Sequence, residues 1–269
     1  MDMPTVDLPP ILAMKDPSAA SVFAPSALLR EARRQKGLAA VDVPSICILD
    51  PDGDLVGHLR KAGLARPFPH WACYHTELDT FDLGGQCVGI VGRVVGASFA
   101  VLVAEELFAS GCHLLVSLTS AGQIIPAGAP PYFVVIDRAL RDEGTSYHYV
   151  NPSEFADADP ELVEAAATAL ARLATRAIVG ASWTTDAPFR ETEAAIESAR
   201  GKGILAVEME ASALYAFACA ANVKVLCLAH VTNTMGQGGD DFEKGIADGA
   251  QDAFTVLAAV VAALNALAR

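Results

Sequence analysis

An alternation of short apolar runs with longer helical patterns, beginning near residue 45, most constrains how this chain can fold. Residues 45–49 and 87–91 are apolar almost without interruption, which is typical of strands buried on both faces of a sheet. Helical patterns separate such runs along the chain. The sequence therefore predicts an α/β fold, namely a single three-layer α/β/α domain with a mixed, mainly parallel central sheet.

The other expected elements follow the same pattern. Further strands are expected at residues 113–118, 132–136, 177–182 and 224–230. Helices are expected at residues 26–35, 98–110, 160–174, 191–200, 209–221 and 241–267. Ser98 is the predicted N-cap of the second helix. Asp159 is the predicted N-cap of the third, because Pro160 follows it at the first helical position.

Composition and charge exclude several classes of protein. The 269 residues are 52% hydrophobic, which excludes a disordered chain. Only 19% are charged, which indicates that part of the surface is covered by another subunit. We therefore expect a homo-oligomer, either a dimer or a hexamer built of dimers. The formal charge of −13 would repel a phosphate backbone, so no nucleic-acid partner is expected.

Targeting and cysteine patterns point to the reducing cytoplasm. The N-terminus carries acids and prolines and lacks the basic-then-apolar layout of a signal peptide. The most apolar stretch, residues 254–268, is shorter than the ~20 residues of a membrane span and contains Asn265, so no membrane partner is expected. The scattered cysteines argue against a disulfide framework and a zinc site. Four of them are expected to be small core residues: Cys47, Cys87, Cys219 and Cys227.

Polar residues follow several predicted strands, at the place where α/β sheets bind ligands. Such segments are residues 92–98, 119–123, 183–192 and 231–235, and Glu208 and Glu210 precede an apolar helix. Residues two apart cannot share one helix face, so these glutamates should have different partners. One of them could be purely structural and the other solvated. The chain contains no nucleophile elbow, phosphate loop or His-Glu-x-x-His motif. The residues alone thus predict an enzyme with a polar site at strand ends.

Residues 206–214 (AVEMEASAL) resemble the Val-Glu-Met-Glu-x-x-x-Leu motif of the nucleoside phosphorylase superfamily, which includes purine nucleoside phosphorylases, uridine phosphorylases and related nucleosidases. Residues 99–122, 137–149 and 183–192 are also similar to family segments, in the same order. The resemblance covers the chain from about residue 45 to its end. It implies a nucleoside phosphorylase-like catalytic domain at residues 41–269, preceded by an N-terminal extension at residues 1–40.

The resemblance assigns roles to several residues. Glu210 matches the glutamate that binds the ribose hydroxyls, and a carboxylate can accept two hydrogen bonds at once. Met209 matches the methionine beneath the sugar and base, where a thioether is a soft apolar floor. Phe189 is expected to frame the base, or alternatively to pack in the core. Three residues are expected to supply hydroxyl and backbone donors to phosphate: Thr119, Ser120 and Gly122.

The same comparison of motifs shows that this chain differs from the family at the positions that bind phosphate. The family's early Gly-Asp-Pro-x-Arg loop corresponds here to residues 50–54 (DPDGD), which hold three acids and no arginine. Ser117 stands where a second phosphate-binding arginine is expected. Arg93 could restore one positive charge, or it could be a surface or subunit-contact residue. An activated water could therefore replace phosphate.

Two positions bear on the base and two on the sugar. Asn233 stands where hexameric purine enzymes carry a general-acid aspartate, and an amide can donate and accept hydrogen bonds but cannot protonate the ring. Arg190 lies near the position of an arginine that reads the uracil oxygen in uridine phosphorylases. His148 and His75 could reach the ribose 5′-hydroxyl, across a subunit contact.

The leading hypothesis is a nucleoside phosphorylase that cleaves the N-glycosidic bond of a uridine-like or 6-oxopurine nucleoside with phosphate, giving free base and ribose 1-phosphate. One alternative is a nucleosidase that uses water. Another is a homologue that binds nucleosides without catalysis. Phosphate is expected as co-substrate, with no other cofactor and no metal.

Overall fold

The computed structural model describes residues 9–13, 15–234 and 244–267 of the chain. The described strands, in chain order, are β1 (Ile46–Asp50), β2 (Arg66–Pro67), β3 (Asp79–Leu83), β4 (Gln86–Gly92), β5 (Leu114–Gln123), β6 (Tyr132–Asp142), β7 (Phe155–Asp157), β8 (Ala177–Thr185), β9 (Ala206–Glu208) and β10 (Lys224–Thr234). The described helices are α1 (Pro25–Lys36), α2 (Asp54–Lys61), α3 (Ala97–Phe108), α4 (Pro160–Leu170), α5 (Glu193–Gly201), α6 (Ala211–Ala221) and α7 (Ala250–Leu267), with single 3-10 turns η1 (Ser146–His148) and η2 (Pro188–Arg190).

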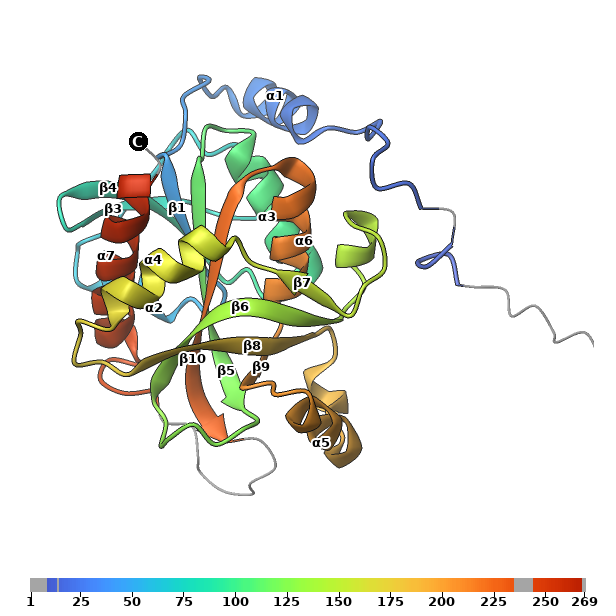
Figure 1. Cartoon of the computed structure of the whole chain (residues 1–269). Coiled ribbons are helices and arrows are strands. Elements are labelled where there is room, and N and C mark those ends of the chain that lie inside the picture. The colour runs from blue at the N-terminus through green and yellow to red at the C-terminus, as the bar shows by residue number, and fades with distance from the viewer. Residues whose placement is uncertain (1–8, 14, 235–243, 268–269) are drawn as a thin grey trace, which may run out of the picture.

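The described strands form one mixed sheet with helices on both faces, as predicted. Helices α2, α4 and α7 cover one face, and α3 and α6 cover the other (Figure 1). The longest pairings are parallel and join β5 to β10 and β6 to β8. Antiparallel pairs add β3 and β2 at one edge. The three-layer α/β/α architecture expected from the alternation of runs is confirmed.

Part of this sheet closes on itself, which the sequence did not indicate. From β5 the order runs through β10, β6, β8 and β9, and β9 then pairs with β5 again. The closed part brings the ends of β5, β8, β9 and β10 to one region of the molecule. This closure positions the candidate site described below.

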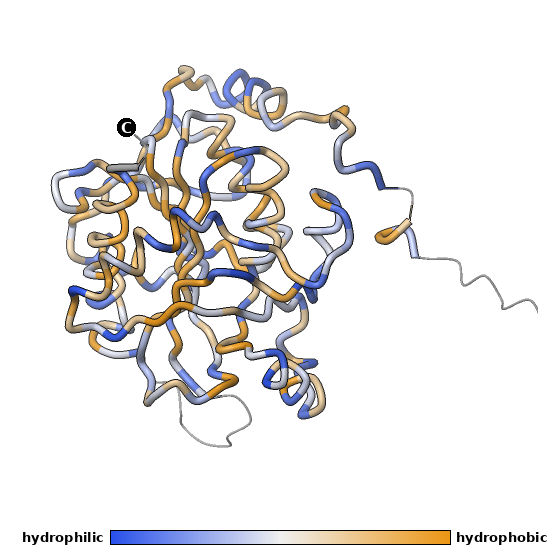
Figure 2. The backbone as a smooth tube through the Cα atoms, in the orientation of Figure 1, coloured by the Kyte–Doolittle hydropathy of each residue, from blue (hydrophilic) through white to orange (hydrophobic). Residues whose placement is uncertain are grey.

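Two apolar cores lie on the two sides of the sheet. One packs α3 and α6 against the strands, and the other packs α2, α4 and α7 against them. Hydrophobic residues are concentrated along the central strands and α7, whereas much of α1 is hydrophilic (Figure 2). Helix α1 attaches to the rest of the chain through a small cluster formed by Leu29 and Ala32 with Ala72.

Several details correct the sequence-based expectations. Ser98 lies inside α3 and is not its N-cap, because the helix begins after Gly96, whose φ of 93° favours glycine. Asp159 does cap α4, accepting a hydrogen bond from the Glu161 N–H. Helix α6 begins two residues later than expected, after Glu210. The final helix begins at Ala250 rather than at residue 241, and residues 241–243 lie outside the described part.

The cysteine prediction holds only in part. Cys47 and Cys227 are buried, as expected, but Cys87 and Cys219 are exposed. The elements expected from the sequence did not include α2, β2, β3, β7 and β9. Among the described residues, no helix is long and apolar enough to cross a membrane.

Candidate active site

The candidate site lies toward the carboxyl end of β5, where one edge of this strand changes partner. Strand β1 pairs with residues 114–117 of β5, and β9 pairs with residues 122–123. Strand β10 runs along the opposite edge of β5 over its whole length. On the edge that pairs with β1 and β9, residues 118–121 of β5 therefore have no described strand beside them. We call this stretch the open edge of β5. Its polar groups are available to side chains and ligands.

Glu208, the last residue of β9, is a fully bonded structural carboxylate. Its Oε1 accepts hydrogen bonds from the hydroxyls of Ser182 (3.0 Å) and Thr184 (2.5 Å). Its Oε2 accepts from the N–H groups of Glu210 (2.6 Å) and Ala211 (2.7 Å) at the start of α6. Glu208 thereby ties β9 and β8 to the first turn of α6, where backbone N–H groups lack helical partners.

Glu210 is buried but keeps one carboxylate oxygen open. Its Oε1 accepts a hydrogen bond of 2.7 Å from the Gly96 N–H, whereas its buried Oε2 makes no hydrogen bond with a described residue. Burial, and after it the charge of Glu208, raise the pKa of Glu210 to about 8, although the Gly96 N–H and the Thr119 hydroxyl oppose the rise. A buried acceptor without a partner suits a ligand that carries hydroxyl groups.

Asp52 reaches across from the end of β1 to the open edge of β5. Its Oδ2 accepts a hydrogen bond from the Ser120 N–H (2.7 Å), and its Oδ1 accepts from the Ser120 hydroxyl (2.8 Å). Asp50 is buried and caps α2, accepting from the Val56 N–H at 2.8 Å. Burial raises the pKa of Asp50 to about 7. Asp54, in the first turn of α2, pairs with Lys244 at 2.5 Å.

Thr119 and Ser120 belong to the open edge of β5, and Glu210 lies close enough to Thr119 for its hydroxyl to affect the pKa of the carboxyl group. Gly122 pairs with Val207 of β9 on one side and with Asn233 of β10 on the other. Met209 is half-exposed in the turn before Glu210. Ser117, which stands where the family resemblance leads one to expect a phosphate-binding arginine, is buried in β5 between β1 and β10.

Phe189 and Arg190 lie on η2, which follows the carboxyl end of β8. Both side chains are exposed, and Phe189 is 98% exposed. The core-packing alternative for Phe189 is therefore wrong. Because β8 runs parallel to β9, η2 lies at the same end of the sheet as Glu208. A small hollow beside Ser120 is lined by Asp52 and His230 among others, and neither Phe189 nor Arg190 lines it.

Arg93 and His75 lie together in a different hollow, of about 300 Å³, that Arg60 also lines. Arg93 is exposed, and its backbone N–H donates to the Asp50 carbonyl at 2.9 Å. The residues that line the hollow beside Ser120 do not include it. The Arg93 side chain instead packs against Gly53 of the acidic segment at residues 50–54.

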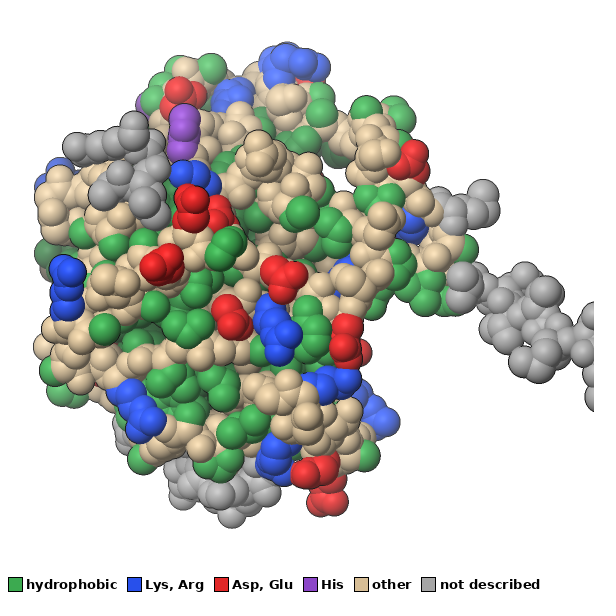
Figure 3. Space-filling model, viewed as in Figure 1, with side chains coloured by type: hydrophobic (Ala, Val, Ile, Leu, Met, Phe, Trp, Pro, Cys, Tyr) green, Lys and Arg blue, Asp and Glu red, His purple; other side chains and the backbone are tan. Residues whose placement is uncertain are grey.

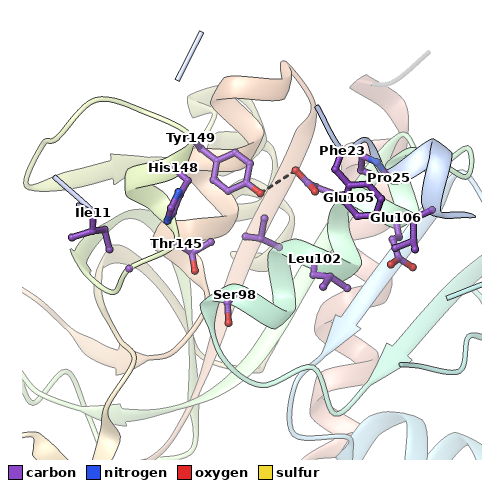
Figure 4. Close-up of a pocket in the computed structure, with 13 residues that line it drawn as sticks. Ile11, Phe23, Pro25, Ser98, Leu102, Glu105, Glu106, Thr145, His148 and Tyr149 are labelled. Atoms are coloured by element: carbon purple, nitrogen blue, oxygen red, sulfur yellow. Dashed lines mark hydrogen bonds between the residues drawn. The ribbon is translucent and has the colours of Figure 1, made fainter. Parts of the chain in front are cut away.

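His148 belongs to a groove of about 480 Å³ between η1, α3 and the N-terminal segment. Figure 4 shows it opposite Ser98 and Leu102 of α3, with Ile11 from the N-terminal segment nearby. Its Nδ1 lies 3.0 Å from the Lys15 ammonium. Ser98, in the first turn of α3, also lines this groove, whereas Glu210 is not among its lining residues.

Among the described residues, no three His, Cys, Asp or Glu side chains are grouped so as to hold a metal ion. On the face shown in Figure 3, acidic and basic side chains are interspersed with apolar patches. That face carries no continuous basic surface of the kind a phosphate backbone binds.

Comparison with known proteins decides the family. The sequence signature of the phosphorylase superfamily matches residues 45–264. The chain belongs to this superfamily. It is 30% identical over 156 residues to a DeoD-type purine nucleoside phosphorylase of Hahella chejuensis, covering 57% of this chain and 66% of that protein, just under two thirds. It is 27% identical over 205 residues to a uridine phosphorylase of Thermococcus kodakarensis, covering 69% of this chain and 73% of that protein.

Solved structures of the superfamily share the fold. A uridine phosphorylase from Vibrio fischeri in complex with 6-hydroxy-1-naphthoic acid superposes with a TM-score of 0.69 at 20% identity, covering 85% of this chain and 93% of that one. A second structure of the Vibrio fischeri uridine phosphorylase gives a TM-score of 0.70 at 19% identity, covering 84% and 95%. The mixed sheet with helices on both faces is therefore the fold of these uridine phosphorylase structures.

Within this superfamily fold, the contact of Asp52 with Ser120 was not expected from the sequence. The sequence shows that acids fill residues 50–54, but it does not show where their side chains point. Helix α2, which begins at Asp54, turns the segment so that Asp52 faces the open edge of β5. In the sequence, this contact is indicated only by an acid-rich segment at the end of one strand and a Thr-Ser pair at the end of another, and these two strands are neighbours in the sheet.

Proposed function

We propose that this chain cleaves the N-glycosidic bond of a nucleoside. Glu210 carries the proposal, because one of its oxygens is fixed by the Gly96 N–H and the other is buried with no described partner. Such an oxygen can accept hydrogen bonds from the vicinal hydroxyls of a sugar. Met209, half-exposed next to it, supplies an apolar floor for the sugar and base.

The geometry suits a reaction that passes through a cation-like sugar. As the bond to the base breaks, positive charge develops on the ribosyl group, and the Glu210 carboxylate stabilises that charge more in the transition state than in the ground state. Glu208 does not compete for this role, because four hydrogen bonds occupy its oxygens. Superfamily membership and the names of the two sequence relatives support a nucleoside as substrate.

Asn233 and Arg190 favour an oxo-base over adenine. Adenine leaves more easily when its ring is protonated, and an amide cannot donate a proton in that way. Uracil and hypoxanthine leave as anions whose charge reaches a carbonyl oxygen, and an amide or guanidinium donor stabilises them without proton transfer. We therefore expect uridine to be cleaved fastest, inosine next and adenosine slowest.

A nucleoside panel tests this function. Purified protein is incubated with uridine, inosine and adenosine at equal concentration, and the free base is quantified by chromatography with and without phosphate. Release of uracil ahead of hypoxanthine and adenine supports the proposal. Faster release of adenine would refute the argument from Asn233, and binding of nucleosides without release of any base would favour the non-catalytic alternative.

A further inference from the structure

At the open edge of β5, the anion that accepts hydrogen bonds is a carboxylate of the protein itself, Asp52. The Ser120 N–H and hydroxyl each donate to one oxygen of Asp52, at 2.7 Å and 2.8 Å. Free backbone N–H groups at a sheet edge, together with a hydroxyl, are the donors by which proteins bind small anions. In this chain a carboxylate of the protein occupies those donors. A phosphate that entered here would first have to displace Asp52.

The charges around this contact also disfavour a second anion. Lys244 is the cation among the residues that line the hollow at Ser120, and it is paired with Asp54 at 2.5 Å. His230 lines the same hollow, and burial lowers its pKa, which favours the neutral ring. Asp52 itself is exposed and close enough to Glu210 for its charge to raise the pKa of that residue. Acidic residues therefore outnumber cations among the described residues that line this hollow.

The available space fits water. The hollow lined by Asp52, Ser120 and His230 has a volume of about 30 Å³. One water needs roughly 10–15 Å³ by this measure, so the hollow admits one or two waters. A buried polar atom of this hollow, Nε2 of His230, makes no hydrogen bond with a described residue, and ordered water is a common partner for such atoms.

We propose that water, not phosphate, replaces the base, and that Asp52 is the general base that accepts a proton from this water. The inference rests on the proposed function, because it names the second substrate of the same reaction. The water oxygen bonds to the anomeric carbon while the bond to the base nitrogen breaks, and the electron pair of that bond leaves with the base. One water proton passes to Asp52 and then to solvent, and the base takes up a proton from solvent. The products are the free base and the free sugar.

The test determines separately whether water or phosphate receives the sugar and whether phosphate binds at Ser120. The full chain is assayed for base release with phosphate absent and with phosphate saturating, and phosphorus NMR distinguishes sugar 1-phosphate from free sugar. Thermal unfolding with and without inorganic phosphate is followed for the wild type, Asp52→Ala and Asp54→Ala. Asp54→Ala is the matched control, because it removes a carboxylate from the same segment and takes this partner from Lys244, while Ser120 stays bonded to Asp52. Asp52→Asn adds a variant that keeps an acceptor for Ser120 without the charge.

We expect base release to be independent of phosphate and the sugar product to be unphosphorylated. Asp52→Ala and Asp52→Asn should each lose about a hundredfold or more in rate, as when a general base is removed. Phosphate should raise the melting temperature of Asp52→Ala but not that of the wild type or Asp54→Ala, because a ligand stabilises only the protein that binds it.

Three results would count against the inference. Base release that requires phosphate and yields sugar 1-phosphate would overturn it and leave the proposed function intact. Absence of base release from every nucleoside, under both conditions, would overturn the proposed function and the inference together. Stabilisation of the wild type by phosphate, or equal stabilisation of Asp52→Ala and Asp54→Ala, would show that Asp52 does not hold the anion position.

Discussion

Replacing Glu210 with glutamine should lower the rate of nucleoside cleavage far more than it lowers stability. The glutamine oxygen can keep the hydrogen bond from the Gly96 N–H, which Oε1 now accepts at 2.7 Å. The other carboxylate oxygen, which has no described partner, becomes an amide nitrogen that donates rather than accepts. The sugar hydroxyls therefore lose both an acceptor and its negative charge.

The size of this loss follows from hydrogen-bond energies. Two charge-assisted hydrogen bonds to the sugar contribute about 1.5–3 kcal/mol each. Their sum lowers kcat/KM by about a hundredfold to ten-thousandfold, since each ~1.4 kcal/mol is a factor of ten in rate. Stability should change little, because burial already raises the pKa of Glu210 to about 8 and the variant removes a charge that is poorly solvated.

Glu208→Gln is the matched control for this experiment. All four of its hydrogen bonds are made within the protein, and an amide nitrogen cannot accept two of them. We expect this variant to lose more stability and less activity than Glu210→Gln. Initial rates of base release and thermal unfolding are measured on both. Near-normal activity of Glu210→Gln, with a lowered melting temperature, would show that Glu210 is a structural residue and refute the reasoning.

Three further predictions follow from the titration of buried acids and from exposed apolar groups. First, kcat/KM should rise with pH toward about 8, because the carboxylate form of Glu210 binds the sugar, and a flat profile would contradict this role. Second, the raised pKa values of Asp50, about 7, and Glu210, about 8, mean that the native state binds these protons more tightly than the unfolded state. Their contribution to the free energy of unfolding is therefore greatest below the unfolded values and is lost as pH rises through 7 and 8, and urea titrations at several pH values check the sign. Third, we expect a dimer or larger assembly at micromolar concentration, with Leu102→Glu shifting it toward monomer, because Leu102 and Phe23 are exposed beside the groove that holds His148. Sedimentation of the wild type as a monomer would oppose this.

The core strands and the two glutamates were predictable because their signals are local. Continuous apolar runs mark β1 and β4, since both faces of these strands are covered. Glu208 and Glu210 were expected to have different partners from their spacing alone, and the structure confirms this. Asp159 was recognisable as a cap from the proline that follows it.

The features that were missed depend on contacts between distant segments. Helix α2 has an acid- and glycine-rich start that is typical of a loop, and Asp50, which lies before the turn, accepts a hydrogen bond from the Val56 N–H in its first turn. The start of α3 is set by Gly96, whose N–H is held by Glu210, 114 residues away in sequence. Cys87 is exposed although residues 88–91 of the same strand are buried, which a run of apolar residues in the sequence does not reveal.

The pairing of β5 with β10 also has a consequence for how the protein folds. It joins Leu114 to Lys224 and continues to Gln123 and Thr234, so the contacting residues lie about 110 positions apart in sequence. Contacts of such long range form late, because the intervening chain must first lose its freedom. Until β10 arrives, one edge of β5 is unpaired, and such an edge is prone to aggregation. The side of the candidate site that holds Asn233 is therefore expected to assemble late, and nascent chains that end before residue 224 lack it altogether.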